Sequence, residues 1–394
     1  MRIGILTYHN PCNFGANLQA YASSRYFESL GHTVKVINLI LDGGKPTPRC
    51  QESQNAAHHH FSQEVLKVTS PVSTGEEILQ VVKEEQFDVV AIGADAVWNK
   101  KNRKRLEIFY AQWLWGTELE EKVRVIALSP AFMGNDYHDL TSNERESFRN
   151  ALLKFHSINV RDTWTRDAVN RDIMGSDYIK TINPDPVFLL HSFCDEEWQH
   201  DASQITSKQY YAISLPKGYS QQLGSYKSQW IRKLKAEVNA RGCKLVELPI
   251  PEGYSGLDGF DYVVKYPIDP LQWFLWLKNA RGFIGLRFHA VVSCISSGTP
   301  FYSFDSYSNL PKWQHYLNLL GYHKSDRTWA YKSKIRNLLE GSGFESYRRN
   351  GSQVFGLSPR KIVEILESQS EAQILAFRDE CIATFKSNME KAIK

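Results

Sequence analysis

Three polar groups stand directly after apolar runs of the sequence, and their types suit acid–base chemistry and anion binding. Asp95, Arg161 and the triplet Arg287-Phe288-His289 each follow a short apolar run. Carboxyl and imidazole groups can donate or accept protons, and the planar guanidinium of Arg binds carboxylates and phosphates. These residues therefore predict a site that combines a general acid and a general base with fixed cations.

Each of these residues also has a structural interpretation that the sequence leaves open. Asp95 could be a helix N-cap, Arg161 could form a surface salt bridge, and His289 could be an ordinary buried histidine. The setting of His289 favours function, because the triplet opens a helix of small residues whose N-terminal amides would join the side chains. Asp185, between two prolines, is interpreted as a turn residue rather than a catalyst.

The first loop, residues 7–17, joins an apolar run to a helical pattern and offers backbone amides that could hold an anionic group. It contains Asn13, Gly15 and Asn17. This spacing does not match GxGxxG, which disfavours an NAD or FAD site. An ordinary strand-to-helix turn is the alternative interpretation. Trp98 adds an indole just past the strand that precedes Asp95.

Histidines and cysteines show no pattern typical of a metal site. The tract His58-His59-His60 has no acid spaced to complete such a site, and we expect a solvated loop there. The six cysteines are far apart and include no CxxC pair, so we expect reduced thiols and neither a zinc site nor a disulfide framework. No P-loop, nucleophile elbow or HExxH motif occurs.

Two series of alternating strands and helices are predicted to position these residues. The first opens with a βαβ pattern over residues 3–40, and the second opens with a strand at residues 210–215. We therefore predict an α/β protein with two domains, residues 1–195 and residues 196–394, in which ligands bind at the carboxyl ends of parallel strands. Residues 42–73, rich in turn-forming residues, are expected to form a long surface excursion.

The composition excludes several classes of protein. Of the 394 residues 42% are hydrophobic and 23% charged, as in globular proteins, and a net charge of +4 is too slight to indicate nucleic-acid binding. No apolar run approaches the roughly 18 residues of a membrane-spanning helix, and the N-terminus does not resemble a signal peptide, so a cytoplasmic protein is expected. The basic run from Lys100 to Arg105 is interpreted as a solvated face; contact with an anionic lipid surface or a pyrophosphate-linked acceptor is the alternative.

Taken together, the motifs resemble those of the polysaccharide pyruvyl transferases. The resemblance covers most of both series and rests on residues 4–8 (GILTY), 13–21 (NFGANLQAY), 92–99 (IGADAVWN), 160–162 (VRD), 184–187 (PDPV), 287–289 (RFH) and 298–301 (GTPF). The chain departs from the family pattern at four places, which are Ala94 for a frequent Ser, Asp162 for Glu, Gly285-Leu286 where a Ser often precedes the Arg, and Phe288 for Leu.

This resemblance implies a GT-B-like fold of two Rossmann-like domains with a cleft between them. It also implies transfer of pyruvate from phosphoenolpyruvate onto two hydroxyls of a sugar in a cell-surface or exopolysaccharide precursor, as a cyclic ketal, with release of phosphate. No metal or cofactor is implied. The roles carried over are acid–base catalysis for His289 and Asp95 in an unassigned order, and donor binding for Arg161 and Arg287. Contact with donor or acceptor is carried over for Phe288, Trp98 and the loop with Asn13, Gly15 and Asn17.

Two other functions stay open at this stage. A nucleotide-sugar glycosyltransferase on the same fold would need an acid to grip the ribose, and Asp305 could serve. A non-catalytic scaffold of a polysaccharide assembly complex would not need the Arg and His residues, which are present. The acceptor sugar, the bridged hydroxyls and a lipid-linked form of the acceptor, met at the inner membrane face, are left undetermined by the sequence.

Overall fold

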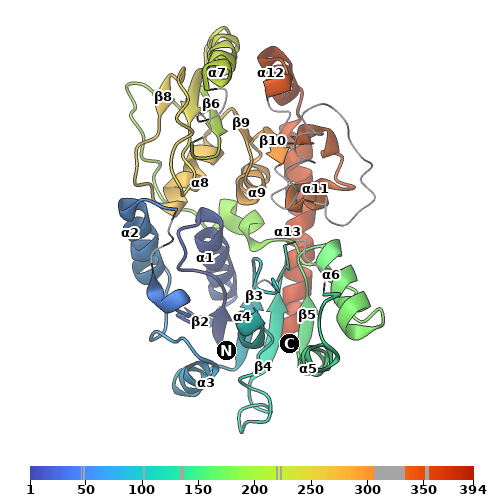
Figure 1. The fold of residues 1–394 in the computed structure, drawn as a ribbon. Helices are drawn as coiled ribbons and strands as arrows, with labels where there is room; N and C mark the ends of the chain where they lie inside the picture. Colours follow the sequence, from blue (N-terminus) through green and yellow to red (C-terminus); the bar gives the residue numbers. More distant parts are fainter. Residues whose placement is uncertain are drawn as a thin grey trace. The chain divides into compact units, whose positions relative to one another are not determined.

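The computed structural model describes residues 1–45, 47, 49–100, 103–133, 137–218, 221, 224–305, 333–350 and 355–394. The chain divides into two compact units (Figure 1). The N-terminal unit comprises residues 1–47, 58–193 and 380–394, and the C-terminal unit comprises residues 48–57 and 194–379. Apart from residues 194 and 195, the predicted domains differ from these units in residues 48–57 and 380–394, because two helices each begin in one unit and end in the other.

The sheet of the N-terminal unit consists of five parallel strands in the order β2-β1-β3-β4-β5. The strands are β1 (Arg2–Leu6), β2 (Thr33–Val36), β3 (Val89–Gly93), β4 (Arg124–Leu128) and β5 (Ser157–Asn159). The helices and helical turns are α1 (Phe14–Ser29), α2 (Glu52–His60), η2 (Phe61–Val65), α3 (Gly75–Glu84), α4 (Arg103–Phe109), α5 (Ser142–Leu153), α6 (Thr163–Val169), η3 (Asn170–Met174) and η4 (Pro186–Ser192). Helix α2 starts in the C-terminal unit and ends in this one.

The sheet of the C-terminal unit has six parallel strands in the order β11-β10-β9-β6-β7-β8. The strands are β6 (Tyr210–Ser214), β7 (Lys244–Glu247), β8 (Tyr262–Val263), β9 (Gly282–Gly285), β10 (Phe301–Asp305) and β11 (Arg348–Asn350). The helices are α7 (Gly224–Asn239), α8 (Pro270–Lys278), α9 (Phe288–Ser297), α11 (Lys334–Leu339), α12 (Pro359–Glu367) and α13 (Glu371–Ile393), of which α13 ends in the N-terminal unit.

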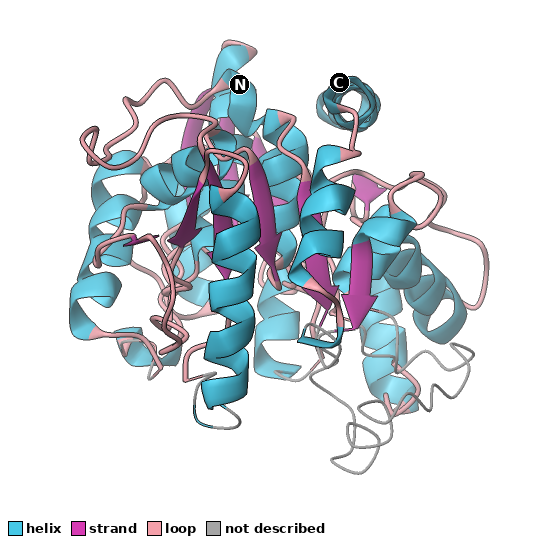
Figure 2. Ribbon diagram, turned by 90° about the horizontal axis from the view of Figure 1, so that it is seen from above, coloured by secondary structure: helices cyan, strands magenta, loops and turns pink. Residues whose placement is uncertain are grey.

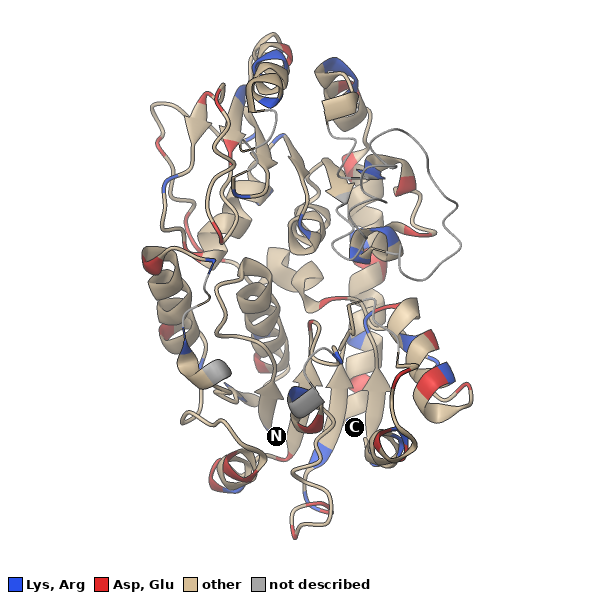
Figure 3. Ribbon diagram, viewed as in Figure 1, with Lys and Arg blue, Asp and Glu red and all other residues tan. Residues whose placement is uncertain are grey.

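The central strands are buried on both faces, because helices cover both sides of each sheet. Every residue of β3, β6 and β9 is buried, as expected for parallel strands between two helical layers. Figure 2 shows helices flanking the strands. Figure 3 shows Lys and Arg beside Asp and Glu on α5 and α7, and the charged residues of these two helices are exposed or half-buried.

The strand orders locate the point in each sheet where α/β proteins bind ligands. In the N-terminal unit the order reverses between β1 and β3, and in the C-terminal unit it reverses between β6 and β9. Loops at the carboxyl ends of two such strands leave the sheet in opposite directions and open a crevice. The residues that follow β1, β3, β6 and β9 are therefore the first candidates for function.

Two expectations from the sequence are wrong. Residues 42–73 are not a surface excursion, because they contain α2 and η2 and pair with the β2 region through the bridges Val36–Val68 and Leu39–Val72. The cysteines are not all reduced either, since Cys12 and Cys50 are disulfide-bonded. Wide spacing along the sequence excludes a CxxC motif but says nothing about distance in the fold. No helix in the described parts of the chain is long and apolar enough to cross a membrane.

Candidate active site

The turn after β3 fixes Asp95 at the point where the N-terminal sheet reverses its order. Gly93 has φ 123°, and a Cβ placed there would lie 2.0 Å from the Leu128 carbonyl oxygen, so only glycine fits. Asp95 has φ 65°, a left-handed conformation that Asp tolerates better than most residues. Its carbonyl accepts a hydrogen bond from the Ala131 amide at 2.8 Å. The turn thus presents the Asp95 carboxyl at the carboxyl end of β3.

Two buried side chains from the β1 side hold this turn in place. The Gln19 Oε1 atom accepts from the Ala94 amide at 3.1 Å, and Gln19 Nε2 donates to Thr7 Oγ1 at 2.9 Å. The Thr7 hydroxyl in turn donates to the Ala94 carbonyl at 3.3 Å. The amide and the carbonyl of Ala94 are therefore both hydrogen-bonded to side chains. The sequence did not predict these two contacts. The signal was present, because Gln19 lies within one of the motifs that carry the resemblance.

Arg161 lies close to three carboxyl groups of the N-terminal unit. Its side chain is 3% exposed, and its Nη1 atom lies 3.1 Å from Asp185 Oδ2 and 3.7 Å from Asp95 Oδ1. Asp162 Oδ2 lies 3.9 Å from Arg161 Nε, and Asp162 Oδ1 caps α6 by accepting from the Thr165 amide. Sequence reasoning underestimated Asp185, whose Oδ1 atom accepts from the Val187 amide as a turn residue would, while Oδ2 pairs with Arg161. A guanidinium beside several carboxylates stabilises their charged forms, which in return compensate its burial.

The predicted loop residues connect to a buried histidine instead of standing alone. Asn13 caps α1 by accepting from the Gly15 amide at 3.0 Å. Asn17 donates to the His9 carbonyl at 2.6 Å and accepts from His58 Nδ1. His58 is fully buried, so it is not part of a solvated tract, and burial lowers its pKa to about 3. A neutral imidazole thus fixes the side chain of Asn17.

Trp98 has a structural place. Its side chain is fully buried, its indole N–H donates to the Phe109 carbonyl at 3.1 Å, and its ring stacks on Tyr110. The structure therefore places this residue in the core beneath the Asp95 turn and not where a substrate would touch it.

The reversal point of the C-terminal sheet carries the second group of predicted residues. Arg287 is the N-cap residue of α9, and its Nη2 atom donates to both carboxylate oxygens of Glu252 at 2.7 Å. His289 is 9% exposed, and its ring meets Phe288 edge-on at 5.1 Å. Lys334 lies over the Phe288 ring, with Nζ 5.9 Å from the centroid. The start of α9 thus presents an arginine and an imidazole, and a lysine from α11 lies over the Phe288 ring.

The remaining candidates fall outside these two groups. Lys100 Nζ donates to Asp139 at 2.6 Å, whereas Lys101 and Asn102 lie outside the described residues, as do the side chains of the two residues that follow. The side chain of Asp305 is likewise not described. No cluster of three or more potential metal ligands occurs among the described residues.

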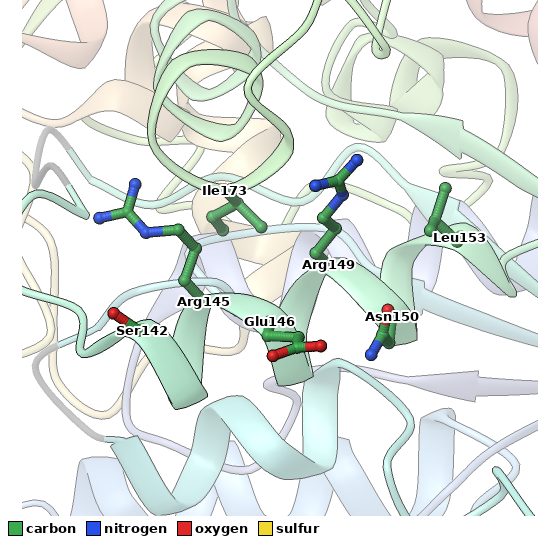
Figure 4. Close-up of a pocket in the computed structure, with 7 residues that line it drawn as sticks. All are labelled: Ser142, Arg145, Glu146, Arg149, Asn150, Leu153 and Ile173. Atoms are coloured by element: carbon green, nitrogen blue, oxygen red, sulfur yellow. The ribbon is translucent and has the colours of Figure 1, made fainter.

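A surface hollow of about 440 Å³ lies between α5 and η3. Figure 4 shows Arg145 and Arg149 on one side of α5, directed toward the segment that carries Ile173. None of the predicted site residues lines it.

A family model described as polysaccharide pyruvyl transferase matches residues 13–309. The chain belongs to the polysaccharide pyruvyl transferase family. The matched stretch contains the Asp95 turn, Arg161 and the start of α9, which confirms the family inferred from the motifs. Membership in this family places the protein among the transferases of polysaccharide biosynthesis.

Comparison with solved structures of known proteins identifies the fold of this family member. A putative UDP-N-acetylglucosamine 2-epimerase from Listeria monocytogenes is 10% identical with TM-score 0.50, over 99% of this chain and 96% of that chain. The S. aureus MnaA–UDP co-structure is 8% identical with TM-score 0.49, over 96% of this chain and 90% of that chain. Spinosyn rhamnosyltransferase SpnG is 10% identical with TM-score 0.48, over the whole of both chains. No curated protein matches the chain. The prediction of two parallel-sheet α/β domains in a GT-B-like fold is confirmed, and such low identity carries nothing about activity.

Proposed function

We propose that the protein transfers pyruvate from phosphoenolpyruvate to a sugar diol of a cell-surface or exopolysaccharide precursor, forming a cyclic ketal. The observation that carries this proposal is the content of the family-matched stretch. Residues 13–309 contain a buried carboxylate–guanidinium cluster at one strand reversal and an accessible Arg with a His at the other. A reaction that needs an acid, a base and an anion-binding cation is suited to these groups.

The chemistry requires two proton movements. Protonation of the methylene carbon of phosphoenolpyruvate creates a cation-like centre at the neighbouring carbon, to which one sugar hydroxyl adds. Loss of the phosphate and addition of the second hydroxyl complete the ketal. Each of the two sugar hydroxyls loses one proton. The carbon that becomes the methyl group gains one proton, and the released phosphate gains the other.

The surroundings of the candidate residues suggest distinct roles. The guanidinium of Arg161 stabilises the charged form of the Asp95 carboxyl, so we assign Asp95 as the base that receives a hydroxyl proton. The imidazole of His289 is then assigned as the acid. Arg287, 45% exposed, is assigned to the phosphate or carboxylate of the donor. Arg161 was expected to bind the donor directly, but its buried position and its carboxylate partners suit a positioning role for Asp95.

The test is a transfer assay with purified protein, phosphoenolpyruvate and a panel of galactosides, glucosides, aminosugars and lipid-linked saccharides. Acceptor-dependent phosphate release, with a product whose mass exceeds that of the acceptor by one pyruvate less one water, is expected. The same panel with nucleotide sugars forms the second arm. Turnover in that arm alone would replace this proposal with glycosyl transfer.

A further inference from the structure

The carboxylate of Glu252 forms an ion pair with Arg287, the residue that we assign to binding of the donor. One nitrogen of the Arg287 guanidinium donates to both Glu252 oxygens at 2.7 Å, and the two side chains are 45% and 25% exposed. Arg287 makes no side-chain hydrogen bond to its own helix. Glu252 is therefore the group that orients the Arg287 guanidinium in this structure.

The backbone around Glu252 is held firmly, so any displacement must come from its side chain. The turn from Ile250 to Gly253 is closed by hydrogen bonds in both directions, the shorter being Gly253 N to Ile250 O at 2.9 Å. The Tyr266 hydroxyl donates to the Ile250 carbonyl at 2.6 Å. Gly253 has φ 127°, which favours glycine directly after Glu252.

A second cation borders the same turn. Lys217, in the loop after β6, is exposed, and a Cβ on Gly253 would lie 3.6 Å from Lys217 Cδ. The loops after β6, β7 and β9 thus bring Lys217, Glu252 and Arg287 to the carboxyl edge of neighbouring strands. Two cationic residues, Lys217 and Arg287, thus border the turn that carries Glu252, and Glu252 pairs with the second of them.

We propose that Glu252 is a built-in competitor, which binds Arg287 until the anionic group of the donor displaces it and which favours departure of the phosphate product. This inference rests on the proposed function. Because an anion that binds Arg287 Nη2 must first displace the Glu252 carboxylate, its apparent affinity is reduced by the fraction of molecules in which the pair is open. The reduction applies to every anion that uses Arg287.

The test is calorimetric titration of the whole protein with inorganic phosphate and with phosphoenolpyruvate at fixed ionic strength. Glu252→Gln keeps the shape of the side chain and removes its charge. We expect about two- to fivefold tighter binding of both ligands, in keeping with a partly exposed ion pair. Glu364→Gln, which breaks the exposed Arg360–Glu364 pair on α12, is the matched control and should change neither constant. Unchanged or weaker binding by Glu252→Gln would overturn the inference.

A double variant locates the effect at Arg287. Adding Arg287→Met to Glu252→Gln should abolish the gain in phosphate affinity, and a gain that persists would place the anion elsewhere and contradict the inference. Phosphate binding needs neither acceptor nor turnover, so the two proposals fail separately. Tighter phosphate binding without any pyruvyl transfer would leave the competitor role standing and refute the proposed function. Transfer activity with equal phosphate affinity in both proteins would refute the competitor role alone.

Discussion

Each unit has an arginine just after a strand of its sheet, Arg161 after β5 and Arg287 after β9, but the two guanidinium groups differ in burial and in their partners. In the N-terminal unit, Arg161 is 3% exposed and faces the carboxylates of Asp185 and Asp95. In the C-terminal unit, Arg287 is 45% exposed and binds one carboxylate, that of Glu252. A buried, fully compensated charge positions its neighbours, whereas an exposed cation can exchange its partner for a ligand. This difference is the basis for our proposal that Arg161 positions Asp95 in one unit and that Arg287 exchanges its partner for an anion in the other.

The largest effect is expected from removing the carboxylate of Asp95. Asp95→Asn should lower acceptor-dependent turnover by about 10²- to 10⁴-fold, the range for a lost general base. The fold should persist, because Arg161 keeps Asp185 as a partner at 3.1 Å. Steady-state kinetics measure this, with Asp139→Asn as control, since that carboxylate is 59% exposed and pairs with Lys100. Full activity of Asp95→Asn would remove the catalytic role from the N-terminal unit.

The contrast between the two arginines predicts unequal losses of stability. Arg161→Met leaves buried carboxylates without their cation and should lower the free energy of unfolding by about 3–5 kcal/mol. Arg287→Met removes a partly exposed pair and should cost about 1 kcal/mol or less. Urea unfolding of both variants measures the difference. Equal losses would show that the distinction between a buried and an exchangeable arginine is wrong.

Two glycines with positive φ provide a smaller test of how rigidly each unit is built. Gly93→Ala would bring a Cβ to 2.0 Å from a backbone oxygen, whereas at Gly298 the nearest atom, at 2.9 Å, belongs to the movable side chain of Leu375. We expect a loss of about 1 kcal/mol for Gly298→Ala, the ordinary cost of a left-handed residue, and at least twice that for Gly93→Ala. Thermal unfolding compares them, and a larger loss at Gly298 would contradict the constraint on the Asp95 turn.

The buried histidine of the N-terminal unit predicts a dependence of stability on pH. Burial lowers the pKa of His58 to about 3, below its unfolded value near 6.5. Between these values the unfolded chain binds the proton and the folded chain does not, so stability falls as the pH drops through this window. The slope is at most about 1.4 kcal/mol per pH unit. Urea unfolding at pH 7 and pH 5 should show a smaller difference for His58→Gln than for the unchanged protein, and identical differences would refute the assignment.

The sequence predicts the central strands of both sheets, because apolar runs such as residues 89–93 must be buried when helices cover both faces. The short edge strands β8 and β11 are not predicted. It also places Asp95 and Arg287 correctly at carboxyl ends of strands. Helix α2 is not predicted, since its polar sequence buries few side chains, chiefly Gln54 and His58. Because α2 is held by a few long-range polar contacts, its sequence lacks the apolar periodicity from which a helix is predicted.

The partners of the charged residues are harder to predict than their positions. Asp185 reads as a turn residue and fills that role, yet its second oxygen pairs with Arg161, 24 positions away in the chain. Glu252 has no motif around it, and only the fold brings it to Arg287. Trp98 shows the reverse case, because a large aromatic residue beside a catalytic candidate is drawn into the core by its apolar area. Pairings of this kind depend on tertiary distances, which local patterns do not contain.

The most direct test of the proposed pyruvyl transfer is to run the reaction in D₂O with phosphoenolpyruvate and a saccharide acceptor, and to examine the product by NMR and mass spectrometry. If a proton is delivered to the methylene carbon, the new ketal will carry a methyl group with one deuterium, and phosphate will appear in equal amount. Phosphate release without a labelled ketal, or sugar transfer from a nucleotide donor in its place, would contradict the claim.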